Sequence, residues 1–152
     1  MLRLSKLTDY AVVVLVRLSG IGPVQTSPGI AAATGIPEPT VAKVLKALCT
    51  GDLVSSQRGA KGGYRLNRGL AAIPIADVIA AIDGPIALTA CVEGSFSGCE
   101  SKDICPMRGR WDPVNDAIRE ALNGITLADM QIGRVAAVRL PTQQALLHSA
   151  VE

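Results

Sequence analysis

The chain has 152 residues, of which 49% are hydrophobic and 3% aromatic, with a formal net charge of +2. This length suits one ordinary domain, or a small domain with an appendage, and the aliphatic composition is unlike that of a disordered chain. The apolar run 11–16 follows Asp9 and is too short for a signal peptide or a membrane span, so we expect a cytoplasmic protein with reduced thiols.

Charge is unevenly distributed along the chain. Residues 1–70 carry nine basic and three acidic side chains, a net +6, whereas residues 71–152 carry six basic and ten acidic ones, a net −4. A nucleic-acid-binding module joined to another segment shows this pattern, although a solvated charged face can produce it too.

Three helices are predicted in the first third of the chain. The first runs from Thr8, as its cap, to Ser19 with a stripe of Ala11, Val12, Leu15, Val16 and Leu18. The second has Ser27 as N-cap, Pro28 at its first position and Gly35 at its end. The third begins near Glu38 and ends at Gly51, with Val41, Val44, Leu45 and Leu48 inward and Thr40, Lys43 and Lys46 outward.

The stretch "LVSSQRGAKGGYRL" predicts two strands joined by a glycine-rich turn. Its tip carries positive charge next to glycines that let the backbone approach another surface: Arg58, Gly59, Lys61, Gly62, Gly63 and Arg65. A helix-turn-helix followed at once by a basic hairpin indicates a winged helix.

Further helices are predicted at 75–82 and 112–123, with a short capped helix from Thr126. The second of these has a narrow apolar seam of Val114, Ile118, Ala121, Leu122 and Ile125, opposite Asn115, Asp116, Arg119 and Glu120. This seam could pack on its own domain or on a second copy of the chain.

A winged helix suits double-stranded DNA, because a helix fits the major groove and basic side chains neutralise phosphates. We expect Glu38, Thr40 and Lys43 to face the major groove and the hairpin to contact the minor groove or its phosphates. The alternative is a winged helix used for protein–protein contact.

Three of the four cysteines, Cys91, Cys99 and Cys105, lie in one Gly/Ser-rich loop, separated by seven and five residues. These gaps are wider than those of structural zinc sites, and the only histidine is His148 in the tail. The spacing favours an iron–sulfur cluster, while zinc and redox thiols stay open.

The start "MLRLSKLTDYAVVVLVRL", the hairpin "RGAKGGYRL", the three-cysteine loop and "LNGITLADM" together resemble the winged-helix regulators that include IscR, NsrR and RirA. The resemblance covers about residues 1–130 and is nearest to members that regulate iron–sulfur cluster assembly operons of the SUF type. It implies a homodimer in which a long helix after the cysteine loop joins the two chains and an iron–sulfur cluster, of two or four irons, controls DNA binding.

The resemblance implies that Cys91, Cys99 and Cys105 are cluster ligands. The IscR kind adds a histidine where this chain has Arg108, which cannot ligate. The NsrR kind adds an aspartate from the partner chain, at the position of Asp9, which could instead only stabilise a helix N-terminus. Ala42 stands where IscR-like members carry a base-reading glutamate, so the operator is expected to differ.

The predicted fold is mainly α with a small β-hairpin wing (α+β): a winged helix-turn-helix plus a long dimerisation helix. The expected parts are a DNA-binding domain (1–84), a cluster-binding loop (85–111), the dimerisation helix with a short capped helix (112–130) and a partly disordered tail (131–152). Cys49 is expected to be a small buried hydrophobe, and Tyr10 and Tyr64 to pack on the core.

The expected function is a DNA-binding regulator, as a repressor, that senses iron, oxygen or nitric oxide and controls iron–sulfur assembly genes. It needs no membrane and no small-molecule substrate. The competing classes are a zinc-stabilised or thiol-redox regulator without a cluster and a small redox or electron-transfer protein. No nucleophile–base pair or cofactor motif favours an enzyme.

Overall fold

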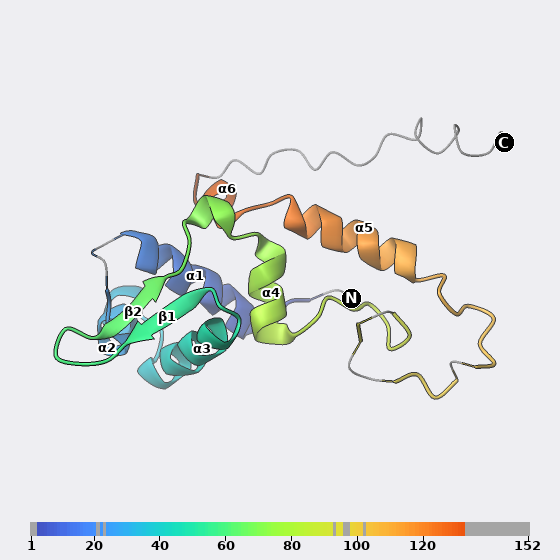
Figure 1. Ribbon diagram of the computed structural model, residues 1–152, viewed down its shortest axis with the longest axis horizontal. Helices are drawn as coiled ribbons and strands as arrows, with labels where there is room; N and C mark the ends of the chain where they lie inside the picture. Colours follow the sequence, from blue (N-terminus) through green and yellow to red (C-terminus); the bar gives the residue numbers. More distant parts are fainter. Residues whose placement is uncertain are drawn as a thin grey trace.

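The computed structural model describes residues 3–20, 22, 24–92, 94–95, 98–101 and 103–132. Its elements are α1 (Lys6–Gly20), α2 (Ser27–Thr34), α3 (Glu38–Thr50), β1 (Val54–Gln57), β2 (Gly63–Leu66), η1 (Leu70–Ala72), α4 (Ile75–Asp83), α5 (Asp112–Asn123) and α6 (Leu127–Ile132). Figure 1 shows α1 to α4 and the hairpin gathered at one end, with α5 extending away from them. The predicted mainly α fold with a β-hairpin wing is confirmed. Within the described part of the chain, no helix is long and apolar enough to cross a membrane.

The first helix begins two residues before the predicted cap, because Ser5 takes that role. The amide of Thr8 donates to Ser5 Oγ at 3.3 Å. Thr8 itself lies inside α1, is only 2% exposed, and its hydroxyl donates to Asp83 Oδ2 at 2.7 Å. The prediction of Thr8 as the cap was therefore wrong, since its side chain serves a contact 75 residues away.

The helix-turn-helix is formed by α2 and α3. Thr26, and not the predicted Ser27, caps α2, because Thr26 Oγ1 accepts from the amide of Gly29 at 3.2 Å. Pro28 accordingly occupies the second helical position. Gly35 ends α2 as predicted, with a left-handed φ of 74°. The predicted inward face of α3 is confirmed, since Val41, Val44, Leu45 and Leu48 are all buried.

The wing is an antiparallel pair of β1 and β2 with Val54 opposite Leu66 and Gln57 opposite Gly63. Gln25 adds a short third rung, because its backbone N–H donates to Tyr64 O at 3.0 Å and its backbone oxygen accepts from Tyr64 N at 2.7 Å. Gly63 is required there: its φ is +153°, and a Cβ would lie 2.5 Å from Gln25 O. The wing is thereby attached directly to the chain entering α2.

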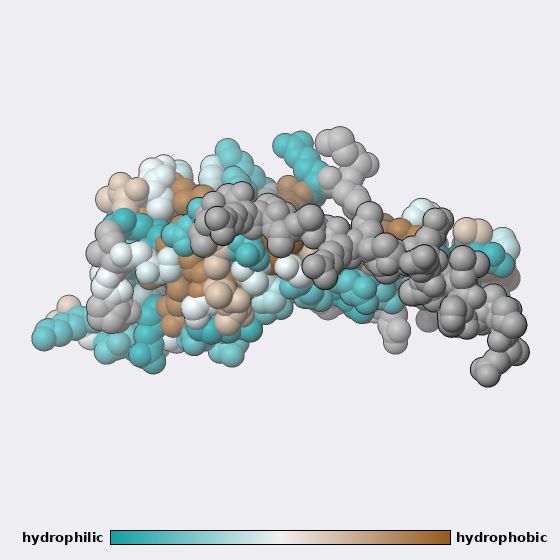
Figure 2. All heavy atoms as spheres, turned by 90° about the horizontal axis from the view of Figure 1, so that it is seen from above, coloured by the Kyte–Doolittle hydropathy of each residue, from teal (hydrophilic) through white to brown (hydrophobic). Residues whose placement is uncertain are grey.

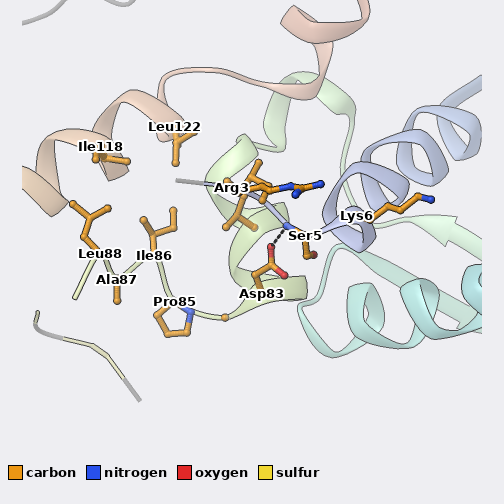
Figure 3. Close-up of a pocket in the computed structure, with 13 residues that line it drawn as sticks. Arg3, Ser5, Lys6, Asp83, Pro85, Ile86, Ala87, Leu88, Ile118 and Leu122 are labelled. Atoms are coloured by element: carbon orange, nitrogen blue, oxygen red, sulfur yellow. Dashed lines mark hydrogen bonds between the residues drawn. The ribbon is translucent and has the colours of Figure 1, made fainter. Parts of the chain in front are cut away.

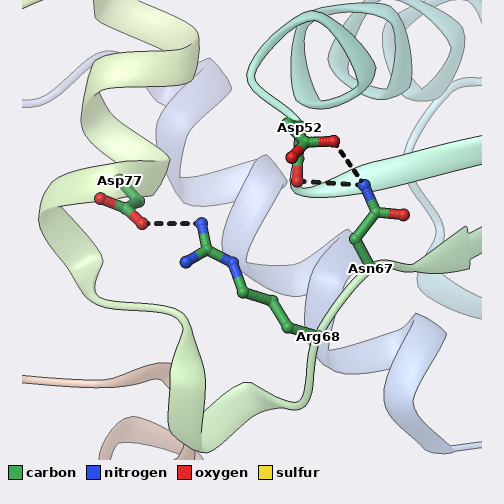
Figure 4. A network of polar contacts seen from close by, with 4 residues as sticks. All are labelled: Asp52, Asn67, Arg68 and Asp77. Carbon is green, nitrogen blue, oxygen red and sulfur yellow. Dashed lines mark hydrogen bonds and ion pairs between the residues drawn. The ribbon is translucent and has the colours of Figure 1, made fainter.

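Two polar contacts hold the base of the wing (Figure 4). Asn67 Nδ2 donates to both the backbone oxygen and Oδ1 of Asp52, each at 3.0 Å. Arg68 forms an ion pair of 2.8 Å with Asp77 on α4. The end of β2 is therefore connected to the turn after α3 and to the following helix.

The aliphatic core lies between α1, α3 and α4 and also receives α6. Leu127 is fully buried in this core, and its amide donates to Ile73 O at 3.0 Å, while Ile75 N donates to Ile125 O at 2.9 Å.

The predicted cap of the short helix α6 is confirmed, because Thr126 and Asp129 exchange hydrogen bonds. These hydrogen bonds hold the pKa of Asp129 below its ordinary value. The chain thus returns from α5 to the winged helix. The predicted tail lies outside the described residues from 133 on, as does His148.

The predicted apolar seam of α5 is only partly buried. Val114 is 44% exposed, whereas Asn115, predicted on the polar side, is fully buried. Asn115 donates from Nδ2 to Ile86 O and accepts at Oδ1 from Leu88 N, each at 3.0 Å. The prediction was wrong for Asn115, because residues 86–88 lie against the helix face that includes Asn115, Ile118 and Leu122. The exposed Val114 leaves open the alternative that part of the seam packs on a second copy of the chain. These two hydrogen bonds of Asn115 form an amide clamp between α5 and residues 86–88.

Asp83, the last residue of α4, accepts hydrogen bonds at the N-terminus of α1. The donors are Thr8 Oγ1 at 2.7 Å and the amide of Ser5 at 3.2 Å. Partial burial would raise the pKa of Asp83, but the hydrogen bonds from Ser5 and Thr8 outweigh it and hold the pKa below its ordinary value. The carboxylate also faces the positive end of the α1 dipole.

Because the folded-state pKa of Asp83 is lowered, its contribution to stability is present above the ordinary value of 3.8 and is lost as the pH falls through the folded-state value. We expect Asp83→Ala to reduce the free energy of unfolding at pH 7 by about 1 kcal/mol, as for loss of a helix cap. Urea unfolding at pH 7 and at low pH should show this difference shrinking in acid. Asp77→Ala, which removes only the exposed ion pair with Arg68, should change stability less. A difference that does not depend on pH would contradict the assignment.

Candidate nucleic-acid interface and cysteine loop

The start of α3 presents polar side chains to solvent. Glu38 and Lys43 are exposed and Thr40 is half-buried, while the opposite face of the helix is fixed in the core. Ala42, at the position noted above, is exposed between them. This face is therefore available to a ligand without any rearrangement of the core.

The wing tip carries the second group of predicted residues. Arg58, Gly59 and Lys61 are exposed, and the amide of Gly62 closes the turn by donating to Gly59 O at 2.9 Å. A Cβ on Gly62 would lie 2.4 Å from Gln57 O, so only glycine fits this turn. Figure 2 shows hydrophilic side chains at the left end of the molecule, where the wing projects in Figure 1.

Arg65 lies on β2, and its Nε donates to Ser55 Oγ on the paired residue of β1 at 3.2 Å. This bond holds the stem of Arg65 across the hairpin while the side chain stays exposed. The wing therefore offers three cations, Arg58, Lys61 and Arg65, on a rigid two-stranded support. Such an arrangement can neutralise phosphates along a duplex, with α3 as a separate, groove-sized element.

The cysteine loop lies between α4 and α5. Cys91 and Cys99 line one cavity of ≈ 410 Å³, together with Arg108, Gly109 and Asp112. Cys105 is not among the described residues that line it. A hydrogen bond of 3.1 Å joins Cys91 Sγ and Thr89 Oγ1, and all four cysteines of the chain are free of disulfides.

The other predicted ligand, Asp9, is exposed in the first turn of α1 and lines neither cavity described at this loop. Arg108 lines the cavity, and its Nη1 lies 3.9 Å from Asp103 Oδ1. Among the described residues, no three Cys, His, Asp or Glu side chains are close enough to hold a metal ion. The structure therefore brings two of the predicted ligands to one cavity and leaves Cys105 and Asp9 apart from them.

The chemistry of this donor set fits a thiophilic iron centre. Three half-buried thiols without disulfides lie on one segment, and two of them face the same cavity. Cys49 does not join them: it is half-buried in α3 against the core, and burial raises the pKa of its thiol. Tyr10 and Tyr64 pack on the core as predicted, while Trp111 is 41% exposed at the start of α5.

A larger cavity of ≈ 770 Å³ lies between the N-terminal residues, the end of α4, residues 84–88 and α5 (Figure 3). Ile86, Leu88, Ile118 and Leu122 form an apolar wall, and Asp83 lies at the other side with its bond to Ser5.

Sequence reasoning missed three residues around the loop: Asp83, Asp112 and Asn115. For Asn115 a signal existed, because it lies three and seven residues before Ile118 and Leu122 and so shares their helix face. Asp83 carries no such signal, because its partners Ser5 and Thr8 lie 78 and 75 residues away in the sequence.

Comparison with known proteins identifies the family. The Rrf2 family, described as "Iron-dependent Transcriptional regulator", matches residues 4–132. The transcriptional regulator IscR of Escherichia coli is 32% identical over 132 residues, covering 85% of this chain and 80% of that protein.

Two solved structures are similar. IscR of T. potens has a TM-score of 0.58 at 32% identity and covers 87% of this chain and 88% of its own. CymR, the global cysteine regulator of B. subtilis, has a TM-score of 0.64 at 29% identity and covers 88% of this chain and 98% of its own. These relatives are regulators and not enzymes. The winged helix, the exposed basic wing and these similarities together show that the chain belongs to the Rrf2 family of DNA-binding transcriptional regulators.

Proposed function

We propose that this regulator is a homodimeric repressor whose affinity for its operator depends on an iron–sulfur centre bound by Cys91, Cys99 and Cys105. The observation that carries the proposal is the pair of thiols sharing one cavity on a loop whose ends are joined by the amide clamp. Iron, oxygen or nitric oxide is the signal, and genes for iron–sulfur cluster assembly are the targets, as the resemblance to IscR-type regulators implies. Because its ligand is the chromosome, the protein acts in the cytoplasm.

DNA is read by two separate elements. The exposed start of α3 enters the major groove, where Thr40 and Lys43 contact bases or phosphates and Glu38 lies at the groove edge. The wing contacts the adjacent minor groove or its phosphates through Arg58, Lys61 and Arg65, and Gly59, Gly62 and Gly63 allow close backbone approach. The rung between Gln25 and Tyr64 keeps the wing in a fixed position relative to α2.

A second copy of the chain pairs with the first through α5 and the residues before it. Four large apolar side chains are exposed on residues 104–114: Ile104, Met107, Trp111 and Val114. A winged helix reads only one half-site, so two copies are needed to read a symmetric operator. Residues 1–84 form the reading head in this proposal, 85–111 the sensing loop and 112–130 the pairing segment.

The iron–sulfur centre supplies a redox- and oxygen-sensitive structure that is present or absent according to the state of the cell. Its protein ligands are the three loop cysteines, with Asp9 of the second copy as the fourth candidate. Two sets of hydrogen bonds within this chain connect the sensing loop to the reading head. The amide clamp joins residues 86–88 to α5, and Asp83, three residues earlier, binds Ser5 and Thr8 at the start of α1. A change in the loop can thereby alter how the two heads are spaced.

Anaerobically purified protein should be brown and contain iron and acid-labile sulfide, since three thiolates favour an iron–sulfur centre over oxygen-ligated metals. Iron and sulfide analysis, with absorption and Mössbauer spectra, measures this and separates two-iron from four-iron clusters. A gel-shift titration of loaded and apo protein on the same operator should give different affinities. Zinc without sulfide, or equal affinities, would contradict the proposal.

Arg58→Ala should weaken operator binding and reduce the slope of log K against log salt by about 1, because one phosphate contact is lost. Fluorescence anisotropy over a range of salt concentrations measures both. Arg3→Ala is the matched control, since Arg3 is also an exposed arginine but lies outside α3, the wing and the cysteine loop. An unchanged affinity and slope for Arg58→Ala would exclude the wing tip from the interface.

A further inference from the structure

We propose that Cys91 and Cys99 form a reversible disulfide when the protein without its iron–sulfur centre meets hydrogen peroxide. These two residues supply the thiols among the described residues that line the ≈ 410 Å³ cavity. Formation of the disulfide does not depend on the proposed function, whereas its effect on iron uptake does.

The cavity offers the chemistry of a thiol pair. Cys105 is not among its described lining residues, and the described part of the chain holds no group of three Cys, His, Asp or Glu side chains that could bind a metal ion. A disulfide needs two sulfur atoms and no further ligand. Oxidation of the pair is therefore a reaction for which the side chains at this cavity suffice.

Both sulfur atoms lie where a small oxidant and a moving backbone can reach them. Cys91 and Cys99 are half-buried, and both lie outside the helices and strands. Gly94 and Gly98, which lie between them in the sequence, also line the cavity, and a Cβ at either would meet no atom of the described residues within 4 Å. Because such backbone can move without repacking the core, the two Cα atoms can adopt the separation of about 4.4–6.8 Å that a disulfide requires.

The other two cysteines are placed differently. Cys49 is fixed in α3 against the core, and burial raises the pKa of its thiol, so that less of the reactive thiolate is present. Cys91 and Cys99 are eight residues apart on one chain, so their effective concentration is on the order of millimolar, well above that of a micromolar protein solution. We therefore expect an intramolecular bond between these two and not a link between two chains.

The reaction is a two-electron oxidation of sulfur by the peroxide. One thiolate attacks the O–O bond, so that an S–O bond forms, the O–O bond breaks, and hydroxide leaves as water with the proton of that thiol. The second thiolate attacks the resulting sulfenic acid, so that the S–S bond forms and the S–O bond breaks, and water leaves with the proton of the second thiol. Two thiols and one hydrogen peroxide thus give one disulfide and two waters.

The disulfide blocks two of the three cysteines assigned to the iron–sulfur centre. This consequence rests on the proposed function: oxidised protein stays in its apo form until a dithiol reduces the bond. Cys91 follows Leu88 by three residues, and the amide of Leu88 donates to Asn115 Oδ1. The new bond therefore closes the loop directly beside the amide clamp.

The test treats reduced apo-protein of the full chain with hydrogen peroxide. We expect wild type to lose two of its four titratable thiols at a rate that does not depend on protein concentration, and to recover both with dithiothreitol. Peptide mass spectrometry should show a link between Cys91 and Cys99. Cys91→Ser and Cys99→Ser should each stop at a sulfenic acid that dimedone labels. Cys49→Ser and Cys105→Ser are the matched controls and should still form the link.

A link through Cys105 or between two chains would overturn the inference, as would wild-type protein that keeps all four thiols or stops at a sulfenic acid. Iron uptake is measured separately, by adding iron and sulfide anaerobically to oxidised and to reduced protein. Equal uptake by both would remove the proposed consequence. Reduced protein that takes up no iron and sulfide would refute the proposed function and leave the disulfide standing.

Discussion

The buried amide of Asn115 is the constraint on which the arrangement of the sensing half depends. It is fully buried on α5, and both of its polar atoms are bound to the backbone of residues 86–88. A buried amide without partners costs about 1–3 kcal/mol, so α5 and this segment stay together in the folded protein. The described residues between them form a loop whose two ends are held close. Cys91 and Cys99, eight residues apart, therefore share a cavity with the first turn of α5.

A second polar contact continues from this clamp to the reading head. Only two residues, Gly84 and Pro85, separate Ile86 from Asp83, and Asp83 binds the first turn of α1. Packed aliphatic side chains of the core connect α1 to α3, the helix whose other side is exposed at Glu38, Ala42 and Lys43. Both contacts are short and directional, so a ligand that favours one loop conformation can act on the winged helix by biasing them. The geometry thus offers a physical link between the cysteine loop and the winged helix.

The wing is fixed independently of that link. Its register, its glycine turn and the rung between Gln25 and Tyr64 involve only residues of the head, as do the contacts of Asn67 and Arg68 at its base. Under the proposed function, phosphate binding by the wing would therefore be a constant property, while the spacing of the two winged helices is the quantity that a dimer would vary. This division agrees with a regulator whose general affinity for DNA persists while its affinity for one operator changes.

Much of the head could be read from the sequence, because local forces determine it. The stripe of α3, the stop at Gly35 and the glycine turn follow from helical periodicity and from backbone angles that only glycine tolerates. Two of the residues that the sequence placed wrongly have distant partners: Thr8 bonds to Asp83, and Asn115 bonds to residues 86–88. The third error, the cap of α2, is a shift of one residue between the neighbouring hydroxyls of Thr26 and Ser27. The cysteine loop has no periodic pattern, so its sequence established the donor chemistry alone. Which donors meet was decided by tertiary structure, since contacts between segments dozens of residues apart depend on how the whole chain packs.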